Sequence, residues 1–176
     1  MRIAGILRES VVDGPGVRFV VFAQGCVHHC PGCHNPETWD PAGGEEWSVR
    51  ELFKIIRKSP DRVKGVTLSG GEPFLQADQM ADLARYVHQR GMSVATFTGY
   101  VYEDLLDMAS CGGDCARLLA ETDILVDGPY VEILKDISLR FRGSSNQRVI
   151  DLKTSRRTGR MEYLIMENEN GKSGNL

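Results

Sequence analysis

Three cysteines stand close together in the first fifth of the sequence, at a spacing that could hold an inorganic centre. Cys26, Cys30 and Cys33 form a C-x3-C-x2-C arrangement, which lets three thiolates converge on one small site. Zinc is one candidate, and because it prefers four closed ligands, a nearby histidine would have to complete the site. The histidines within reach are His28, His29 and His34. The other candidate is a cluster of four irons held by three thiolates, which leaves one iron open to a substrate.

A second segment whose residues could bind a ligand is Ser69-Gly70-Gly71-Glu72-Pro73. Taken alone, two glycines before Glu-Pro are typical of a tight connection between a strand and a helix. At the end of a strand, however, glycines also let the backbone approach a ligand closely. Glu72 and the neighbouring carbonyl groups could then accept hydrogen bonds from an ammonium group.

Both segments follow predicted strands. The β-branched and aromatic residues 17–22 predict a buried strand that leads into the cysteines, and residues 63–68 predict a second strand that ends before Ser69. Active sites of parallel α/β folds gather at the carboxyl ends of the strands. This position favours an active site over a purely structural metal site.

Strands and helices alternate along the rest of the chain. Ser48 and Glu51 form a predicted capping box at the start of a helix that extends to residue 58. Further helices are expected at 78–90, 102–109 and 116–121, and further strands at 93–98, 123–126, 147–152 and 162–166. Alternation of this kind predicts βαβ units and a parallel sheet. Since 176 residues are well below the roughly 250 of a closed eightfold barrel, we expect an α/β fold built as an incomplete (β/α) barrel of about six strands.

The composition limits the possible classes of protein. With 41% hydrophobic and 26% charged residues, the chain resembles a globular protein, and it contains no apolar stretch long enough to span a bilayer. Charged residues within 1–12 argue against a signal peptide, so we expect a cytoplasmic protein. We expect one domain over 1–167 and a flexible tail over 168–176, where no apolar face is present.

The net charge of −3 gives no general attraction to nucleic acid, but one segment is strongly basic. Residues 139–160 contain seven Arg or Lys against one Asp, which makes this segment +6 and the rest of the chain −9. The segment could be a docking surface, or it could place an arginine on a carboxylate of a cofactor. Cys111 and Cys115, with only two potential ligands, are expected to be ordinary loop cysteines.

The motifs together resemble a known family. The cysteine loop with the following residues 34–40, combined with the Ser-Gly-Gly-Glu-Pro segment, is similar to the radical S-adenosylmethionine (radical SAM) family, and within it to the activases of glycyl radical enzymes. Residues 126–130 and 139–148 are similar to the subgroup that activates anaerobic (class III) ribonucleotide reductases. The resemblance extends from residue 3 to residue 151.

The resemblance implies an enzyme with two cofactors. The three cysteines would hold a 4Fe-4S cluster, whose open iron would bind the amino and carboxylate groups of S-adenosylmethionine. The remaining site residues implied are Gly70, Gly71 and Glu72 at the methionine amino group, the backbone of Gly32, Cys33 and His34 beside the adenine, and Asp127 near the bound cofactor. Asp127 could equally be a turn residue before a glycine.

The resemblance also implies the partners. The macromolecular substrate would be the anaerobic ribonucleoside-triphosphate reductase, and a one-electron donor such as flavodoxin or ferredoxin would reduce the cluster. No nucleic acid and no membrane is expected to take part. Three alternatives remain: activation of another glycyl radical enzyme, a radical SAM reaction on a small molecule, and a zinc-stabilised binding module without catalysis.

Overall fold

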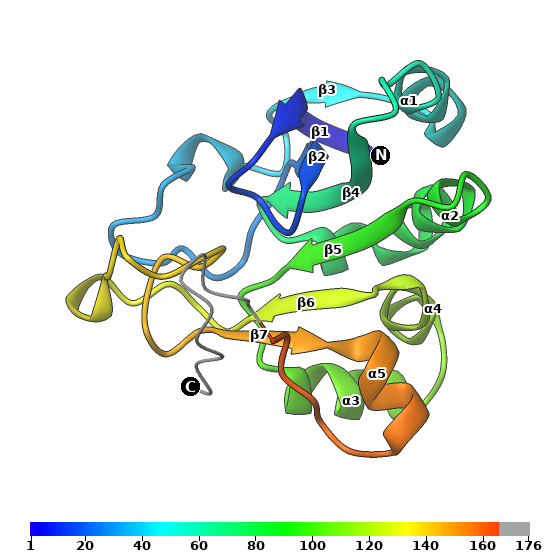
Figure 1. Cartoon of the computed structure of the whole chain (residues 1–176). Helices are drawn as coiled ribbons and strands as arrows, with labels where there is room; N and C mark the ends of the chain where they lie inside the picture. Colours follow the sequence, from blue (N-terminus) through cyan, green and yellow to red (C-terminus); the bar gives the residue numbers. More distant parts are fainter. Residues whose placement is uncertain (166–176) are drawn as a thin grey trace.

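The structure is a computed structural model that describes residues 1–165. These residues form one seven-stranded sheet with the order β3-β1-β2-β4-β5-β6-β7 (Figure 1). The strands are β1 (Arg2–Ser10), β2 (Val17–Ala23), β3 (Glu45–Glu46), β4 (Val63–Gly70), β5 (Ser93–Phe97), β6 (Ile124–Asp127) and β7 (Arg148–Asp151). The helices are α1 (Val49–Ile56), α2 (Ala77–His88), α3 (Tyr102–Ser110), α4 (Asp114–Glu121) and α5 (Leu152–Thr158).

The central strands of the sheet are parallel, and the strands that flank them are antiparallel to them. β2, β4, β5 and β6 run parallel to one another, whereas β1 pairs antiparallel with β2 and β7 pairs antiparallel with β6. The α/β class and the parallel centre of the sheet are therefore confirmed. The sheet has seven strands where about six were expected, and whether it curves as an incomplete barrel stays a prediction.

The elements with strong local signals are found where the sequence predicts them. Helix α1 begins at the expected capping box, in which Ser48 Oγ accepts a hydrogen bond from Glu51 N at 3.2 Å and Glu51 Oε2 accepts one from Ser48 N at 2.9 Å. The helix ends at Ile56, two residues earlier than residue 58. Reciprocal bonds of this kind depend only on residues three apart, which is why this helix start can be predicted from the sequence.

Three elements were not predicted. Strand β1 lies near the edge of the sheet and is partly exposed, so it lacks the continuous apolar run of a central strand. Strand β3 has two residues, and α5 has seven. The strand expected at 162–166 is reduced in the described part to a single bridge between Ile150 and Tyr163. The expected tail, 168–176, lies outside the described residues.

The main core lies between the sheet and the helices. Val66 and Leu68 of β4 are fully buried, as are Met80, Leu83 and Val87 of α2. Figure 1 shows α1, α2 and α4 on one side of the drawing and the loops that follow β2 and β6 on the other. The loop after β2, residues 24–44, contains the three clustered cysteines. It begins where β2 ends, so it lies at the carboxyl ends of the parallel strands, which we call the carboxyl edge of the sheet.

Among residues 1–165, no helix has both the length and the apolar character needed to cross a membrane.

Candidate functional site at the carboxyl edge of the sheet

The cysteine loop is closed at its base by backbone hydrogen bonds. Gly25 N donates to Thr38 O at 2.8 Å, and Cys26 N donates to Trp39 O at 3.1 Å. The thiols of Cys26, Cys30 and Cys33 are free and partly exposed. Burial raises the pKa of the Cys26 thiol, against the opposing effect of backbone hydrogen bonds from His28 and His29.

The side chains of the three histidines in this loop contact groups other than the cysteines. The Nε2 atom of His28 lies 2.8 Å from Glu72 Oε2. The rings of His29 and His34 pack on Trp39 and Tyr130, with centroid distances of 5.0 and 4.9 Å. In the described part of the chain, no three side chains of Cys, His, Asp or Glu are grouped so that they could hold a single metal ion.

The Gly-Gly-Glu turn lies directly against the segment that leads into the cysteines. Gly71 N donates to Ala23 O and Glu72 N donates to Gly25 O, each at 2.8 Å. A Cβ atom at Gly71 would come within 2.2 Å of Gly25 O, so a side chain at this position would force the two segments apart. The structure thus brings together the two motifs that the sequence analysis singled out.

Glu72 is fully buried and accepts hydrogen bonds from the ends of several elements. Its carboxylate accepts from Phe74 N at 3.0 Å and from Thr98 Oγ1 and Gly99 N at 2.9 Å, in addition to the contact with His28. The carboxylate therefore links the cysteine loop to the segment after β5. Its expected contact with a methionine ammonium stays a prediction, as do those of Gly70 and Gly71.

Thr98 and Gly99 were missed by the sequence analysis. They follow β5, and the rule that pointed to the ends of β2 and β4 applies equally to the end of β5. A Cβ atom at Gly99 would come within 2.3 Å of the His28 ring, so this glycine makes room for the histidine.

Asp127 is held by the chain's own donors at the end of β6. It is fully buried, it accepts from Tyr102 N at 2.7 Å, and both of its oxygens contact Arg148, with Nε at 3.0 and 3.1 Å. Arg148 also donates to Glu103, and this hydrogen bond lowers the pKa of Glu103 to about 2. A contact between Asp127 and a cofactor stays a prediction.

The far end of the cysteine loop packs against residues that follow β6. Gly32 has a φ of +72°, and a Cβ atom there would come within 2.8 Å of Glu132 Cδ. His34 lies against Tyr130, as described above, and Cys33 Sγ accepts from Asn35 N at 3.4 Å. Of the three residues expected beside an adenine, Gly32 and His34 thus lie against the segment after β6, and His34 also lines the cavity described next. Their contact with an adenine stays a prediction, as does that of Cys33.

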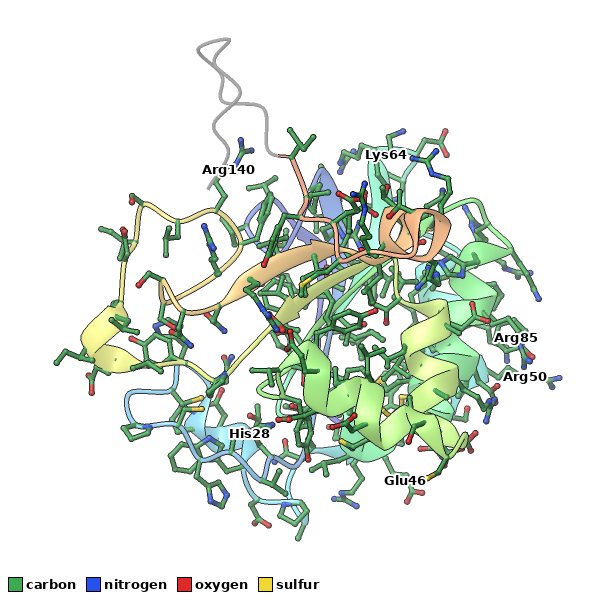
Figure 2. All side chains as sticks on the ribbon, turned by 90° about the horizontal axis from the view of Figure 1, so that it is seen from below. His28, Glu46, Arg50, Lys64, Arg85 and Arg140 are labelled. Atoms are coloured by element: carbon green, nitrogen blue, oxygen red, sulfur yellow. The ribbon has the colours of Figure 1, made fainter. Side chains whose placement is uncertain are left out.

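A cavity of about 530 Å³ opens at this edge of the sheet. Its walls come from the β1–β2 connection, the cysteine loop, the ends of β4 and β5, and the long segment after β6. They include Asp13, His34, Asn35, Ser69, Phe97, Tyr130, Arg140, Arg142 and Gln147. Figure 2 shows His28 and Arg140 on the loop side of the molecule, whereas Arg50 of α1 and Arg85 of α2 lie on the side of the helices. The volume is within the range of small-molecule sites, roughly 300 to 1,000 Å³.

The arginines of the basic segment, residues 139–160, have different surroundings. Arg148 forms the internal ion pairs already described, and Arg156 Nη1 donates to Leu119 O and Thr122 O at the end of α4, at 3.1 and 2.9 Å. Arg140 and Arg142 line the cavity, and Arg157 is exposed on α5. The segment is therefore only in part an open basic surface.

Comparison with known proteins identifies the class. Residues 12–150 match the family described as a 4Fe-4S single cluster domain, and the chain belongs to that family. A relative from Escherichia coli strain K12, the anaerobic ribonucleoside-triphosphate reductase-activating protein, is 36% identical over 152 residues, which cover 82% of this chain and 94% of the relative. The protein of the same name from enterobacteria phage T4 is 34% identical over 145 residues, covering 78% and 86%. The chain thus belongs to the family of anaerobic ribonucleoside-triphosphate reductase-activating proteins.

A second kind of activating enzyme is also similar. The pyruvate formate-lyase-activating enzyme of Clostridium pasteurianum is 41% identical over 137 residues, which cover 74% of this chain. The match covers 53% of that relative, so the chain spans about half its length.

Proposed function

We propose that this protein generates the glycyl radical of the anaerobic ribonucleoside-triphosphate reductase, by reductive cleavage of S-adenosylmethionine at a 4Fe-4S cluster. The observation that carries the proposal is the similarity to the reductase-activating proteins over 94% of the Escherichia coli relative's length. The position of the cysteine loop, at the carboxyl edge of the parallel strands and beside a cavity, supports it.

The side chains present fit such a cluster. Cys26, Cys30 and Cys33 are free thiols in one loop, and they would supply the three thiolates. When bound and reduced, the cluster would supply the electron that splits S-adenosylmethionine into methionine and a 5′-deoxyadenosyl radical, which removes a hydrogen atom from a glycine of the partner. The protein's part is to bind, orient and shield these groups.

Several contacts suit the chain to this positioning task. The buried Glu72 carboxylate holds the cysteine loop against the ends of β4 and β5, and the bonds of Gly71 and Glu72 to Ala23 and Gly25 fix the start of that loop. A reactive radical requires a rigid surrounding, because small displacements would misalign the reacting atoms. Fully hydrogen-bonded buried networks supply rigidity of this kind.

The mouth of the cavity suits a macromolecular substrate. Val11, Val12 and Ile137 line the cavity and are nevertheless 72%, 70% and 92% exposed. Exposed apolar side chains grouped at one place are typical of protein interaction sites. We propose that these side chains form the entrance for the glycine loop of the reductase, in a sheet that curves as an incomplete (β/α) barrel with one open side. The proposed electron donor is a flavodoxin or ferredoxin in the cytoplasm.

The experiment is an anaerobic activation assay. Reconstituted protein, S-adenosylmethionine, a strong one-electron reductant and the reductase are mixed, and the glycyl radical doublet is recorded by electron paramagnetic resonance. We expect a stable doublet that requires all four components. Absence of the doublet, with an intact cluster and an intact reductase, would overturn the proposal.

A pyruvate formate-lyase is the second candidate partner, on the strength of the 41% identity to its activating enzyme. The match covers only 53% of that enzyme, against 94% of the Escherichia coli reductase-activating protein, so we favour the reductase. The same assay with the lyase in place of the reductase separates the two. A doublet on the lyase alone would retain the chemistry and change the partner.

A further inference from the structure

The motif Arg142-Gly143-Ser144-Ser145-Asn146-Gln147 forms a tight turn at the wall of the cavity. The Gln147 side chain closes this turn, because its Oε1 accepts from Gly143 N at 2.9 Å and from Ser144 N at 3.2 Å. Its Nε2 donates to Gly128 O at 3.0 Å. The turn is thereby tied to the loop that follows β6.

Two more hydrogen bonds fix the turn to the same loop. Asn146 Nδ2 donates to Pro129 O at 2.8 Å, and Val131 N donates to Ser144 Oγ at 3.2 Å. A Cβ atom at Gly143 would come within 3.1 Å of the Tyr130 ring and 3.4 Å of the His34 ring. The turn therefore lies against the cysteine loop, and the residue before Gly143 lines the cavity beside that loop.

That residue, Arg142, has a hydrogen-bond donor without a partner. Its Nη1 donates to Gln147 O at 2.8 Å, but its Nε is buried and has no hydrogen-bond partner among the described residues. Arg142 is near the negative charge of Asp136, whose carboxylate accepts from Ser138 N and Oγ. A buried cationic donor left unpaired is unfavourable, so its retention at a cavity wall points to an anionic ligand.

We propose that Arg142 binds the carboxylate of S-adenosylmethionine; this inference rests on the function proposed above. The cavity is lined by two arginines and one acid, Asp13, whose carboxylate accepts from Ser10 Oγ. A carboxylate that uses one oxygen on an iron retains lone pairs for a guanidinium, and the planar fork of Arg suits that geometry. Gln147 acts through the turn and is a positioning residue.

The test uses two ligands that differ only in the carboxylate: S-adenosylmethionine and its decarboxylated form. Binding of each to cluster-loaded protein is measured by calorimetry. We expect Arg142→Gln to weaken binding of S-adenosylmethionine about tenfold to hundredfold, as for loss of a charged hydrogen bond, and to change binding of the decarboxylated form less than about twofold. Arg157→Gln, on the exposed face of α5, is the matched control and should change neither.

Equal weakening of both ligands, or of neither, would overturn the assignment of Arg142. Arg142→Lys retains the positive charge and is the second variant, in case the Gln variant does not fold. It should show the same selective loss to a smaller degree, and an equal response to both ligands would again contradict the proposal. If the wild-type protein fails to bind S-adenosylmethionine at all, the proposed function itself is wrong, which distinguishes the two failures.

Discussion

Two arginines, one buried and one partly buried, show that polar groups are paired differently at the amino ends and at the carboxyl ends of the parallel strands. Arg18, near the start of β2, is 1% exposed, and its guanidinium donates to Thr67 Oγ1, Ser93 Oγ and Val66 O at 3.1, 2.7 and 2.6 Å. Burial lowers the pKa of Arg18 to about 10. Arg142, in the loops at the carboxyl edge, leaves a buried Nε–H without a partner.

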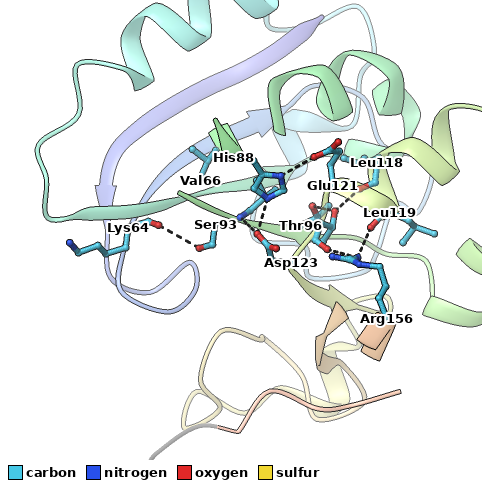
Figure 3. A network of polar contacts seen from close by, with 12 residues as sticks. Lys64, Val66, His88, Ser93, Thr96, Leu118, Leu119, Glu121, Asp123 and Arg156 are labelled. Carbon is cyan, nitrogen blue, oxygen red and sulfur yellow. Dashed lines mark hydrogen bonds and ion pairs between the residues drawn. The ribbon is translucent and has the colours of Figure 1, made fainter. Parts of the chain in front are cut away.

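The neighbouring groups follow the same division. At the amino ends of β5 and β6, His88 lies between Glu121 and Asp123, at 2.8 and 2.9 Å (Figure 3). Within residues 1–165, the buried side-chain atoms without a partner are Trp39 Nε1 and Arg142 Nε, and both belong to loops at the carboxyl edge. A buried polar network in which every group has a hydrogen-bond partner stabilises a fold, whereas a group without a partner is available to a ligand. We therefore expect changes at the amino edge to affect stability alone and changes at the carboxyl edge to affect cofactor binding as well.

The largest effect is expected in the cysteine loop. Replacing Cys26, Cys30 or Cys33 by Ala removes one of three thiolates and should abolish the iron and sulfide content of anaerobically reconstituted protein. The double variant Cys111→Ala/Cys115→Ala is the control and should retain its iron. One zinc and no iron in the wild-type protein, or loss of more than half the iron in the control, would contradict this prediction.

Glu72→Ala should affect both stability and cofactor binding, since it lies at the carboxyl edge and links its loops. The change leaves the buried donors of Phe74, Thr98 and Gly99 without an acceptor. We expect the free energy of unfolding, measured by anaerobic denaturant titration, to fall by about 3 kcal/mol or more. A loss below about 1 kcal/mol would show that water replaces the carboxylate and that the link is weak.

His88→Gln sharpens the comparison from the amino edge. The pKa of His88 is raised mainly by its hydrogen bond with Asp123, against the opposing effect of burial and with support from Glu121. Asp151 and Lys153 also line this region. Because the folded pKa is raised, the protonated ring stabilises the fold fully below the unfolded pKa of about 6.5, and this contribution disappears as the pH rises through the folded pKa.

The variant should therefore lose about 1 kcal/mol of unfolding free energy near pH 6 and less near pH 9. Urea titrations at the two pH values measure this difference. Its iron content should match that of the wild type at both. An equal loss of stability at the two pH values, or a loss of iron, would break the division between the edges.

The smallest effect is expected at the exposed part of the basic segment. Arg157→Glu should lower the rate of reductase activation about twofold to fivefold at low ionic strength and less at high salt, because rim charges act mainly on association. Cleavage of S-adenosylmethionine without the reductase should not change. Arg156 is unsuitable for this test, since it binds the carbonyl groups at the end of α4. A rate that does not depend on this charge would argue against docking through this segment.

Local chemistry explains what could be predicted from the sequence. The spacing of the three cysteines, the capping box at Ser48 and the buried strands at 17–22 and 63–68 each depend on residues close together in the chain. The alternation of strands and helices was enough to place the cysteine loop and the Gly-Gly-Glu turn at one edge of a parallel sheet. The resemblance to the activases followed from the same short motifs.

The tertiary structure alone decided which polar groups are paired. Asp127 and Arg148 are 21 residues apart, and Glu72 and His28 are 44 apart, so no local pattern indicates that these side chains meet. The pairing of β1 and β7 as antiparallel strands likewise depends on partners distant in sequence. The sequence showed a run of arginines, but only packing decided their roles. Arg148 forms internal ion pairs, whereas Arg142 has a buried donor without a partner at the cavity. Burial and competition for hydrogen bonds depend on the whole folded chain, so no short stretch of sequence indicates them.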